Sequence, residues 1–285
     1  MELSRREVLA IGCASALVSA FPAQARTPFR LGLTPVFLDN DAVVIERLRS
    51  ALTEALGVPV TMEQRRTYKE VTEMLLDGAL DAAWLCGYPY LQHKNVLDLV
   101  AVPVWNGKPL YRSYLIVAPD DDATSLDDLR GAIHAFSDPD SNSGFLVTAS
   151  ELAKKGLRPD GYFGRTIFTY GHRNVVRAVS SGLVRSGSVD GYVWEALSVM
   201  EPEMTARTKV IFRSEWLGFP PVCARKDRMQ DAGVAAFQRA VLGLRDSAKG
   251  QAALDLLQLD SMTAAEPALF DGIARRMEIY NTVSR

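Results

Sequence analysis

The sequence is poor in the residues that most often carry metal or covalent chemistry. Its 285 residues include three cysteines and three histidines, and no metal-ligand spacing connects them. Only Cys86 and Cys223 lie beyond the N-terminal region, which is too few for a disulfide framework. They either form one bridge or remain small buried apolar residues, and we expect the second because free cysteine packs well in cores. No metal site is expected.

Long apolar runs and blocks of one charge are also missing. After the first 25 residues, no stretch is apolar over the roughly 18 residues that a membrane-spanning helix needs. The chain has 32 basic and 34 acidic residues, for a formal net charge of −2. A near-neutral protein of this kind gives no reason to expect nucleic acid or anionic lipid as a partner.

The motifs of common enzymes are absent as well. The chain contains no GxSxG, no HExxH, no paired-carboxylate motif, no phosphate loop and no cofactor-binding motif. We therefore expect no catalytic residues and no cofactor. An enzyme built on a similar scaffold remains an alternative, because a fold does not determine a function.

The first 25 residues have the order of an export signal. Arg5 and Arg6 precede a mildly apolar stretch from Leu9 to Phe21, and the segment ends in "AQA". An arginine pair, an apolar core and a small-residue site in this order are typical of a twin-arginine leader. We expect cleavage after Ala25 and a mature periplasmic protein of residues 26–285.

Strand and helix patterns alternate along the mature chain. A short strand pattern at 29–35 is followed by apolar residues at helical spacing over 41–57, and the alternation restarts near residue 113. This alternation of strands and helices indicates an α/β protein whose parallel sheets carry helices on both faces. We expect two lobes with a ligand cleft between them: residues 26–115 with 221–285, and residues 116–220. In the second lobe, "SVDGYVW" (188–194) is expected to be a strand.

The most unusual stretch is "DPDSNSGFLV", residues 138–147, between a strand pattern at 132–136 and a helix pattern at 144–156. Serine and asparagine cap helices, and glycine tolerates unusual backbone angles, so the stretch could be a helix cap only. Hydroxyls, an amide and helix N–H groups together also form a cradle for an anion. The stretch falls at the carboxyl end of a strand, where open α/β sheets bind their ligands.

Five segments, in order, are similar to one known family. "DAAWLCGYPY", "YRSYLIVAP", "SDPDSNSGFLV", "YGHRNVVRAV" and "VDGY" together resemble the phosphonate-binding family of periplasmic solute-binding proteins. The resemblance runs over nearly the whole mature chain. It implies a two-lobed Venus-flytrap fold of the second solute-binding type. It also implies capture of phosphonate, phosphite or a phosphate-like oxyanion for the membrane permease of an ABC importer.

The resemblance also implies which residues bind the ligand. The hydroxyl-rich turn of the family corresponds to Ser141, Asn142 and Ser143, with Gly144 allowing close approach of the backbone. The family's two aromatic positions are matched by Tyr68 and Tyr111, and its "GH" pair by Gly171 and His172. Its acidic strand end is matched by Asp190, which in members that bind amino-phosphonates meets the ammonium group. The implied set is Tyr68, Tyr111, Ser141, Asn142, Ser143, Gly144, His172 and Asp190.

Two departures from the family pattern concern the ligand. Asn142 stands where a hydroxyl residue is usual, which keeps a hydrogen-bond donor but changes its length. After Asp190, "GYVWEAL" replaces a polar, Asn-rich stretch, so that Tyr192 and Trp194 add bulk and Glu195 is only loosely placed. Fewer polar groups at this end argue against an amino-phosphonate.

A sensor is the main alternative to a transport protein. Some relatives bind arsenite through a cysteine thiolate and present themselves to a membrane histidine kinase, since trivalent arsenic prefers sulfur. Cys86, at a strand end facing the expected cleft, is the candidate here, with Cys223 possible nearby. The simpler interpretation of "WLCG" is a tight strand-to-helix turn that contains a small apolar residue.

Overall fold

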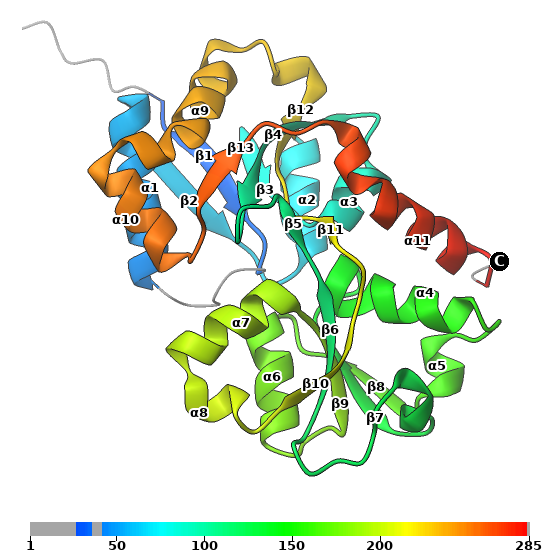
Figure 1. Ribbon diagram of the computed structural model, residues 1–285. Coiled ribbons are helices and arrows are strands. Elements are labelled where there is room, and N and C mark those ends of the chain that lie inside the picture. The colour runs from blue at the N-terminus through cyan, green and yellow to red at the C-terminus, as the bar shows by residue number, and fades with distance from the viewer. Residues whose placement is uncertain (1–26, 36–41, 284–285) are drawn as a thin grey trace, which may run out of the picture.

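The computed structural model describes residues 27–35 and 42–283. The predicted leader, residues 1–25, lies outside the described residues. The described chain forms two lobes, each built on its own β-sheet, and a two-stranded ribbon lies where they meet (Figure 1). The predicted two-lobed α/β architecture is therefore confirmed.

The first lobe contains a six-stranded sheet in the order β13-β4-β12-β3-β1-β2. Its strands are β1 (Phe29–Leu33), β2 (Val60–Gln64), β3 (Ala82–Trp84), β4 (Leu97–Val104), β12 (Val222–Arg225) and β13 (Ser261–Thr263). Its helices are α1 (Ala42–Leu56), α2 (Tyr68–Leu76), α3 (Gly87–Gln92), α9 (Ala232–Leu242) and α10 (Ala248–Leu256). The helix predicted over 41–57 is α1, which ends before Gly57, where a φ of 65° favours glycine.

The second lobe contains a five-stranded sheet in the order β10-β6-β9-β7-β8. Its strands are β6 (Ser113–Val117), β7 (Ile133–Phe136), β8 (Arg165–Phe168), β9 (Ser186–Asp190) and β10 (Lys209–Arg213). Its helices are a π-helical turn (Asn142–Leu146), α4 (Val147–Ala153), α5 (Pro159–Tyr162), α6 (His172–Ser180), α7 (Gly191–Met200) and α8 (Pro202–Thr205).

Both sheets are mixed, which corrects the prediction of parallel sheets. β1 pairs in parallel with β2 and β3, and β7 pairs in parallel with β8 and β9. β12 runs antiparallel to β3 and β4, and β6 runs antiparallel to β9 and β10. The direction of β6 and β12 follows from the path of the chain, because each of these strands enters its sheet from the other lobe.

The strand predicted over 188–194 is wrong in its second half. β9 ends at Asp190 and α7 begins at Gly191. The Asp190 carboxylate accepts hydrogen bonds from the backbone N–H of Tyr192 at 2.9 Å and of Val193 at 3.3 Å. An aspartate that caps a helix in this way turns an aromatic and β-branched segment, which otherwise favours a strand, into the first turn of a helix.

The two lobes are connected by the short ribbon of β5 (Leu110–Tyr111) and β11 (Leu217–Gly218), which pair antiparallel. The boundary predicted between residues 115 and 116 falls inside β6, all of whose residues pair within the second sheet. The second predicted boundary, between residues 220 and 221, lies between β11 and β12. We therefore propose that the first crossing lies at the ribbon, before β6.

The C-terminal helix α11 (Asp271–Asn281) belongs to neither lobe alone, although residues 221–285 were expected in the first. It packs against α4 of the second lobe and also contacts α3 of the first (Figure 1). Arg276, 4% exposed, donates to Ser150 Oγ at 2.8 Å and to Glu151 Oε1 at 2.9 Å on α4. It also binds Glu215, which lies between β10 and β11.

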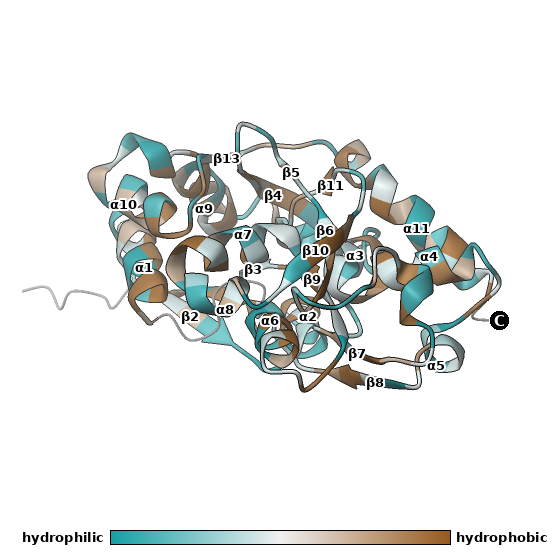
Figure 2. Ribbon diagram, turned by 60° about the horizontal axis from the view of Figure 1, so that its bottom comes forward, coloured by the Kyte–Doolittle hydropathy of each residue, from teal (hydrophilic) through white to brown (hydrophobic). Residues whose placement is uncertain are grey.

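Buried strands hold the turns that follow them. Every residue of β6 and β9 is buried, and Figure 2 shows hydrophobic residues along the central strands near β6 and β10. The carboxyl ends of β7 and β9 are therefore anchored in the core. Within the described ranges, no helix combines the length and the apolar character needed to cross a bilayer.

Candidate ligand-binding site

The eight predicted ligand residues come together where the two lobes meet, and all of them are buried. They come from helix starts, strand ends and the connecting ribbon. We call this group the cradle; its members are Tyr68, Tyr111, Ser141, Asn142, Ser143, Gly144, His172 and Asp190. The contacts below connect each of them to at least one other member or to an adjoining residue.

The turn at 141–146 is the centre of the cradle. Ser141 caps it, accepting a hydrogen bond from the Gly144 N–H at 3.0 Å, and Asn142–Leu146 form a π-helical turn before α4. A π-turn is rare and widens the helix at its start, often at a functional site. A Cβ on Gly144 would lie 1.8 Å from Ser137 Oγ and 3.0 Å from His172 Cε1, so only glycine fits there.

His172 connects the lobes and carries no charge. The backbone N–H of Asp190 donates to His172 Nδ1 at 3.1 Å, so the ring proton is on Nε2 and donates to Tyr68 Oη at 3.1 Å. Burial lowers the pKa of His172 to about 3. The neutral imidazole therefore holds Tyr68, from the first lobe, in place without adding positive charge to the site.

Asp190 is held near the neutral form. Burial raises the pKa of its carboxyl to about 7, and the N–H groups of Val193 and Tyr192 only partly offset this effect. Its Oδ2 lies 3.5 Å from Ser143 Oγ, at the limit of a hydrogen bond. Around neutral pH, Asp190 can therefore either donate a hydrogen bond as an acid or accept one as a carboxylate.

Asn142 bridges the turn to the ribbon and to the first lobe. Its Nδ2 donates to Tyr111 Oη at 2.8 Å, and its backbone N–H donates to Cys86 Sγ at 3.2 Å. Burial raises the pKa of Cys86 to about 12, so its sulfur is a thiol. Cys86 and Cys223 are both free and buried, as expected from the sequence.

Asp138 lies beside the cradle and was not predicted. This second-lobe residue accepts a hydrogen bond from the Tyr68 N–H, at the start of α2 in the first lobe, at 3.1 Å. Its other oxygen accepts from the Asp140 N–H at 2.8 Å. Ser113 was also missed; its Oγ donates to the Ser143 carbonyl at 2.6 Å. Both contacts join segments far apart in the chain, which no local pattern reveals.

The cradle contains helix N-termini instead of cations. The starts of α2, α3, α6, α7 and the π-turn meet through the contacts described above, and helix N-termini favour anions. Among the charged side chains that are buried in the described part of the chain, Arg276 is the one cation, and it binds acceptors on α4. No group of three or more potential metal ligands occurs in residues 27–35 and 42–283.

Two grooves mark the seam between the lobes on the surface. One, of about 520 Å³, lies between α2, α3 and Asp140 of the second lobe. The other, of about 240 Å³, lies between the end of β2 and Tyr170 of the second lobe, where Arg66 stacks on the Tyr170 ring at 4.8 Å. The cradle itself is closed from solvent, because the two lobes touch across it.

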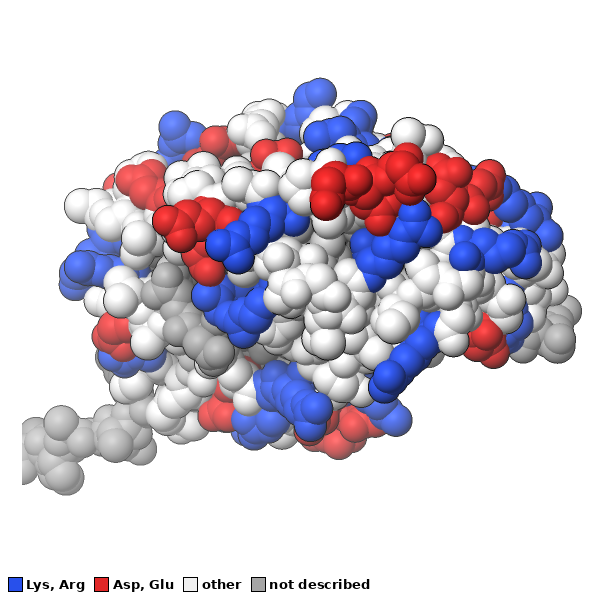
Figure 3. All heavy atoms as spheres, turned by 90° about the horizontal axis from the view of Figure 1, so that it is seen from below, with Lys and Arg blue, Asp and Glu red and all other residues white. Residues whose placement is uncertain are grey.

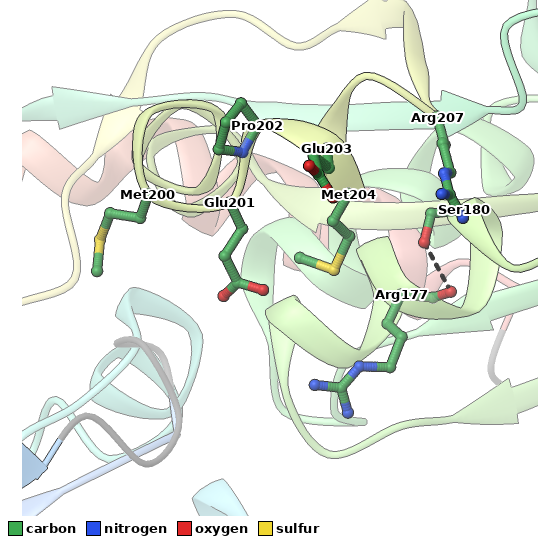
Figure 4. A pocket seen from close by; sticks show the side chains of 8 residues that line it. All are labelled: Arg177, Ser180, Met200, Glu201, Pro202, Glu203, Met204 and Arg207. Carbon is green, nitrogen blue, oxygen red and sulfur yellow. Dashed lines mark hydrogen bonds between the residues drawn. The ribbon is translucent and has the colours of Figure 1, made fainter.

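A further cavity opens on the outer surface of the second lobe. A cavity of about 500 Å³ opens at the far ends of α6 and α7, where Arg177, Glu201 and Arg207 are among the residues that line it (Figure 4). Figure 3 shows acidic and basic side chains side by side on the underside of this lobe. One such ion pair joins Arg185 to Asp121 at 2.8 Å. Mixed charges of this kind create no single-signed field.

Comparison with known families agrees with this geometry. A family model described as the phosphonate periplasmic substrate-binding protein of ABC transporters matches residues 31–270. The match covers both lobes, the ribbon and every residue of the cradle.

Solved structures share the fold. A binding-protein component of a phosphonate ABC transporter from Pseudomonas aeruginosa is 21% identical, with a TM-score of 0.83, covering 90% of this chain and 88% of the other. PhnD1 from Prochlorococcus marinus, in complex with methylphosphonate, is 19% identical with a TM-score of 0.75, covering 89% and 98%. A Xanthomonas citri protein bound to chloride is 17% identical, with a TM-score of 0.71, covering 90% and 98%.

The chain belongs to the family of periplasmic phosphonate substrate-binding proteins of ABC transporters. The resemblance noted in the sequence is therefore confirmed. The members of this family are transport proteins that bind a substrate and deliver it to a permease.

Proposed function

We propose that this member of the phosphonate-binding family closes its two lobes on a small phosphorus oxyanion at the cradle and delivers it to an ABC permease. One observation supports this most strongly: residues from both lobes and the ribbon meet in a buried polar cluster at several helix starts. Such a cluster replaces the water around an anion with fixed N–H and O–H donors.

Each residue has a distinct role in this proposal. The turn of Ser141, Asn142 and Ser143 supplies hydroxyl, amide and backbone donors to the ligand oxygens, and Gly144 keeps the turn close to its neighbours. Tyr68 and His172 close the site from opposite lobes. Tyr111 holds the Asn142 amide in place. Asp190 favours a ligand whose nearest group can accept a hydrogen bond from its acid form or donate one to its carboxylate.

The ligand is a small phosphonate, phosphite or phosphate-like anion. With a neutral His172, an Asp190 whose pKa lies near 7 and no buried cation beside them among the described residues, the cradle favours a ligand of low charge. Delivery takes place in the periplasm. We also propose export of residues 26–285 by the twin-arginine route, on the strength of the arginine pair and the "AQA" segment.

The test is thermal unfolding of residues 26–285 with a panel of methylphosphonate, 2-aminoethylphosphonate, phosphite, phosphate, sulfate and arsenite. A ligand at a hundredfold excess over its Kd adds about 2.7 kcal/mol to the free energy of unfolding, a shift of several degrees. A shift with one or more phosphorus oxyanions supports the proposal.

Two results would contradict it. A shift with arsenite alone would point to the thiol of Cys86, and Cys86→Ser should then abolish that shift. If no member of the panel shifts the Tm, the proposed ligand class is contradicted, whereas the description of the fold is unaffected. Sulfate serves as the control for anion binding without specificity, because it has a similar shape but no proton to donate near neutral pH.

A further inference from the structure

The wall of the cradle contains a serine, Ser137, that is not among the eight predicted ligand residues. Ser137 follows β7 directly and is fully buried, yet its Oγ has no hydrogen-bond partner. Across the described residues, four buried side-chain polar atoms lack a partner, and two of them, Ser137 Oγ and Asn142 Oδ1, lie in the segment between β7 and α4. A buried hydroxyl without a partner destabilises a fold by about 1–3 kcal/mol, so its retention calls for an explanation.

The position of Ser137 directs its hydroxyl toward the ligand side of the strand. Phe136, one residue earlier, packs among aromatic rings that include Phe163 and Phe168. Successive side chains along a strand point to opposite faces, so Ser137 points away from this aromatic cluster. It points toward Gly144, where an added Cβ would lie 1.8 Å from Ser137 Oγ, and toward the His172 ring next to it.

The backbone around Ser137 fixes the hydroxyl in this place. The Ser137 N–H donates to the Gly144 carbonyl at 3.2 Å, which ties the strand end to the π-turn. Gly144 in turn leaves the space that the hydroxyl occupies. The hydroxyl therefore lies between the π-turn and the imidazole that joins the lobes.

We propose that Ser137 is a ligand-binding residue whose hydroxyl donates to an oxygen of the bound phosphorus oxyanion. This inference rests on the proposed function, because it needs a ligand oxygen beside Gly144 and His172. Closure of the lobes on the ligand then supplies the partner that the protein alone does not provide. A hydrogen bond to a charged oxygen is stronger than one between neutral groups.

The experiment compares Ser137→Ala with wild-type residues 26–285, using methylphosphonate and inorganic phosphate as probes in calorimetric titration. The proposal expects binding about ten- to a hundredfold weaker in the variant, from the loss of one charge-assisted hydrogen bond. It also expects that, without ligand, the Tm is unchanged or slightly raised, because the removed hydroxyl had no partner. A residue that acts only through the structure would lower both the Tm and the affinity.

Thr61→Val is the matched control. Thr61 Oγ1 is another buried hydroxyl without a partner, and it lies on β2 in the first lobe, outside the cradle. Its replacement should leave the Tm unchanged or slightly raised, as in Ser137→Ala, and should leave the affinity for either probe unchanged.

The outcomes separate the two proposals. If Ser137→Ala binds a probe with the same affinity as the wild type, the proposed role of Ser137 is overturned and the proposed function still stands. The same holds if Ser137→Ala has both a lower Tm and a weaker affinity than the wild type. A wild-type protein that binds neither probe nor any other phosphorus oxyanion would overturn both.

Discussion

The second lobe contains two buried histidines, His134 and His172, whose surroundings differ. His134, on β7, pairs through Nδ1 with Ser186 Oγ at 2.8 Å and through Nε2 with Ser188 Oγ at 2.9 Å. Thr148 completes this group by a 2.6 Å bond to Ser188. His172, at the start of α6, belongs to the cradle, where Ser137 Oγ and Asn142 Oδ1 have no partner.

The two groups differ in a property that would distinguish the proposed binding site from a polar core. Burial lowers the pKa of both histidines to about 3, so burial and titration do not separate them. The two histidines differ in their position and in the hydrogen-bond pairing of the polar atoms around them. The His134 group lies within the sheet and is fully paired, whereas the cradle lies at strand ends between the lobes and keeps unmatched polar atoms. A paired network stabilises a core, and an unmatched one leaves hydrogen bonds for a ligand.

The largest expected effect comes from removing two hydroxyls of the turn. Ser141→Ala combined with Ser143→Ala should weaken oxyanion binding by about 2–5 kcal/mol, at roughly 1–3 kcal/mol for each bond to a charged group. Calorimetric titration with the ligand found in the panel would measure this loss. Ser186→Ala in the His134 group is the control: it should lower the Tm and leave the affinity within twofold. If the double variant and Ser186→Ala bind the ligand equally well, the cradle does not differ from the His134 group in ligand binding.

The next effect concerns acid stability. Below pH 6.5 an unfolded chain protonates its histidines, but His134 and His172 stay neutral in the fold until about pH 3. Each therefore lowers the free energy of unfolding by about 1.4 kcal/mol per pH unit as the pH falls from 6 to 4. Asp190 offsets the effect of one histidine. Its pKa is raised to about 7 in the fold, so Asp190 raises the free energy of unfolding as the pH falls from 6 to 4.

Two glutamine variants sharpen this point. His134→Gln and His172→Gln should each remove one histidine's share of the acid sensitivity, measured by denaturant unfolding at pH 6, 5 and 4. Only His172→Gln should also weaken ligand binding at pH 7.5. Similar binding losses in the two variants would mean that the His134 group takes part in the site.

The smallest effect is a gain in stability. Asp190→Asn keeps a helix cap but removes a buried acid whose pKa is raised to about 7, so it should raise the free energy of unfolding by about 1–3 kcal/mol at pH 8. The gain should fade as the pH falls toward 4, because the carboxyl is then protonated in the fold and approaches its ordinary pKa of 3.8 in the unfolded chain. In the wild type, affinity for an anion should weaken as the pH rises through 7, and the variant should lose part of this dependence. A wild-type affinity that rises instead would indicate a ligand with a cationic group at Asp190.

Much of the fold could be predicted from periodicity, and the errors have non-local causes. The helix over 41–57 and the two α/β units follow from apolar spacing alone. The direction of β12 could not be predicted, because it depends on where the chain returns from the other lobe. The overlong strand after Ser188 arose because Tyr192 and Val193 favour strands, while the cap that bends the chain is a side-chain contact.

The cradle could be predicted where its residues follow a local motif. Ser141–Gly144 form a capped helix start that the local sequence suggests, whereas His172 and Asp190 were predicted only through the family resemblance. Ser137 and Asp138 could not be predicted in this way, because one is recognised by the lack of a partner and the other by a partner in the opposite lobe.

The C-terminal helix α11 links the lobes a third time, beside the two strands of the ribbon. Opening must either break the bonds of Arg276 to α4 or slide α11 over α3, where Tyr90 and Phe270 meet edge to face at 5.1 Å. Sliding of an apolar contact is the easier of the two. Because α3 begins at Cys86, whose sulfur accepts a hydrogen bond from the Asn142 N–H of the cradle, we expect movement of the chain end to be coupled to release of a ligand. A crosslink between α11 and α3 would therefore lengthen the residence time of the ligand without touching the groups that bind it.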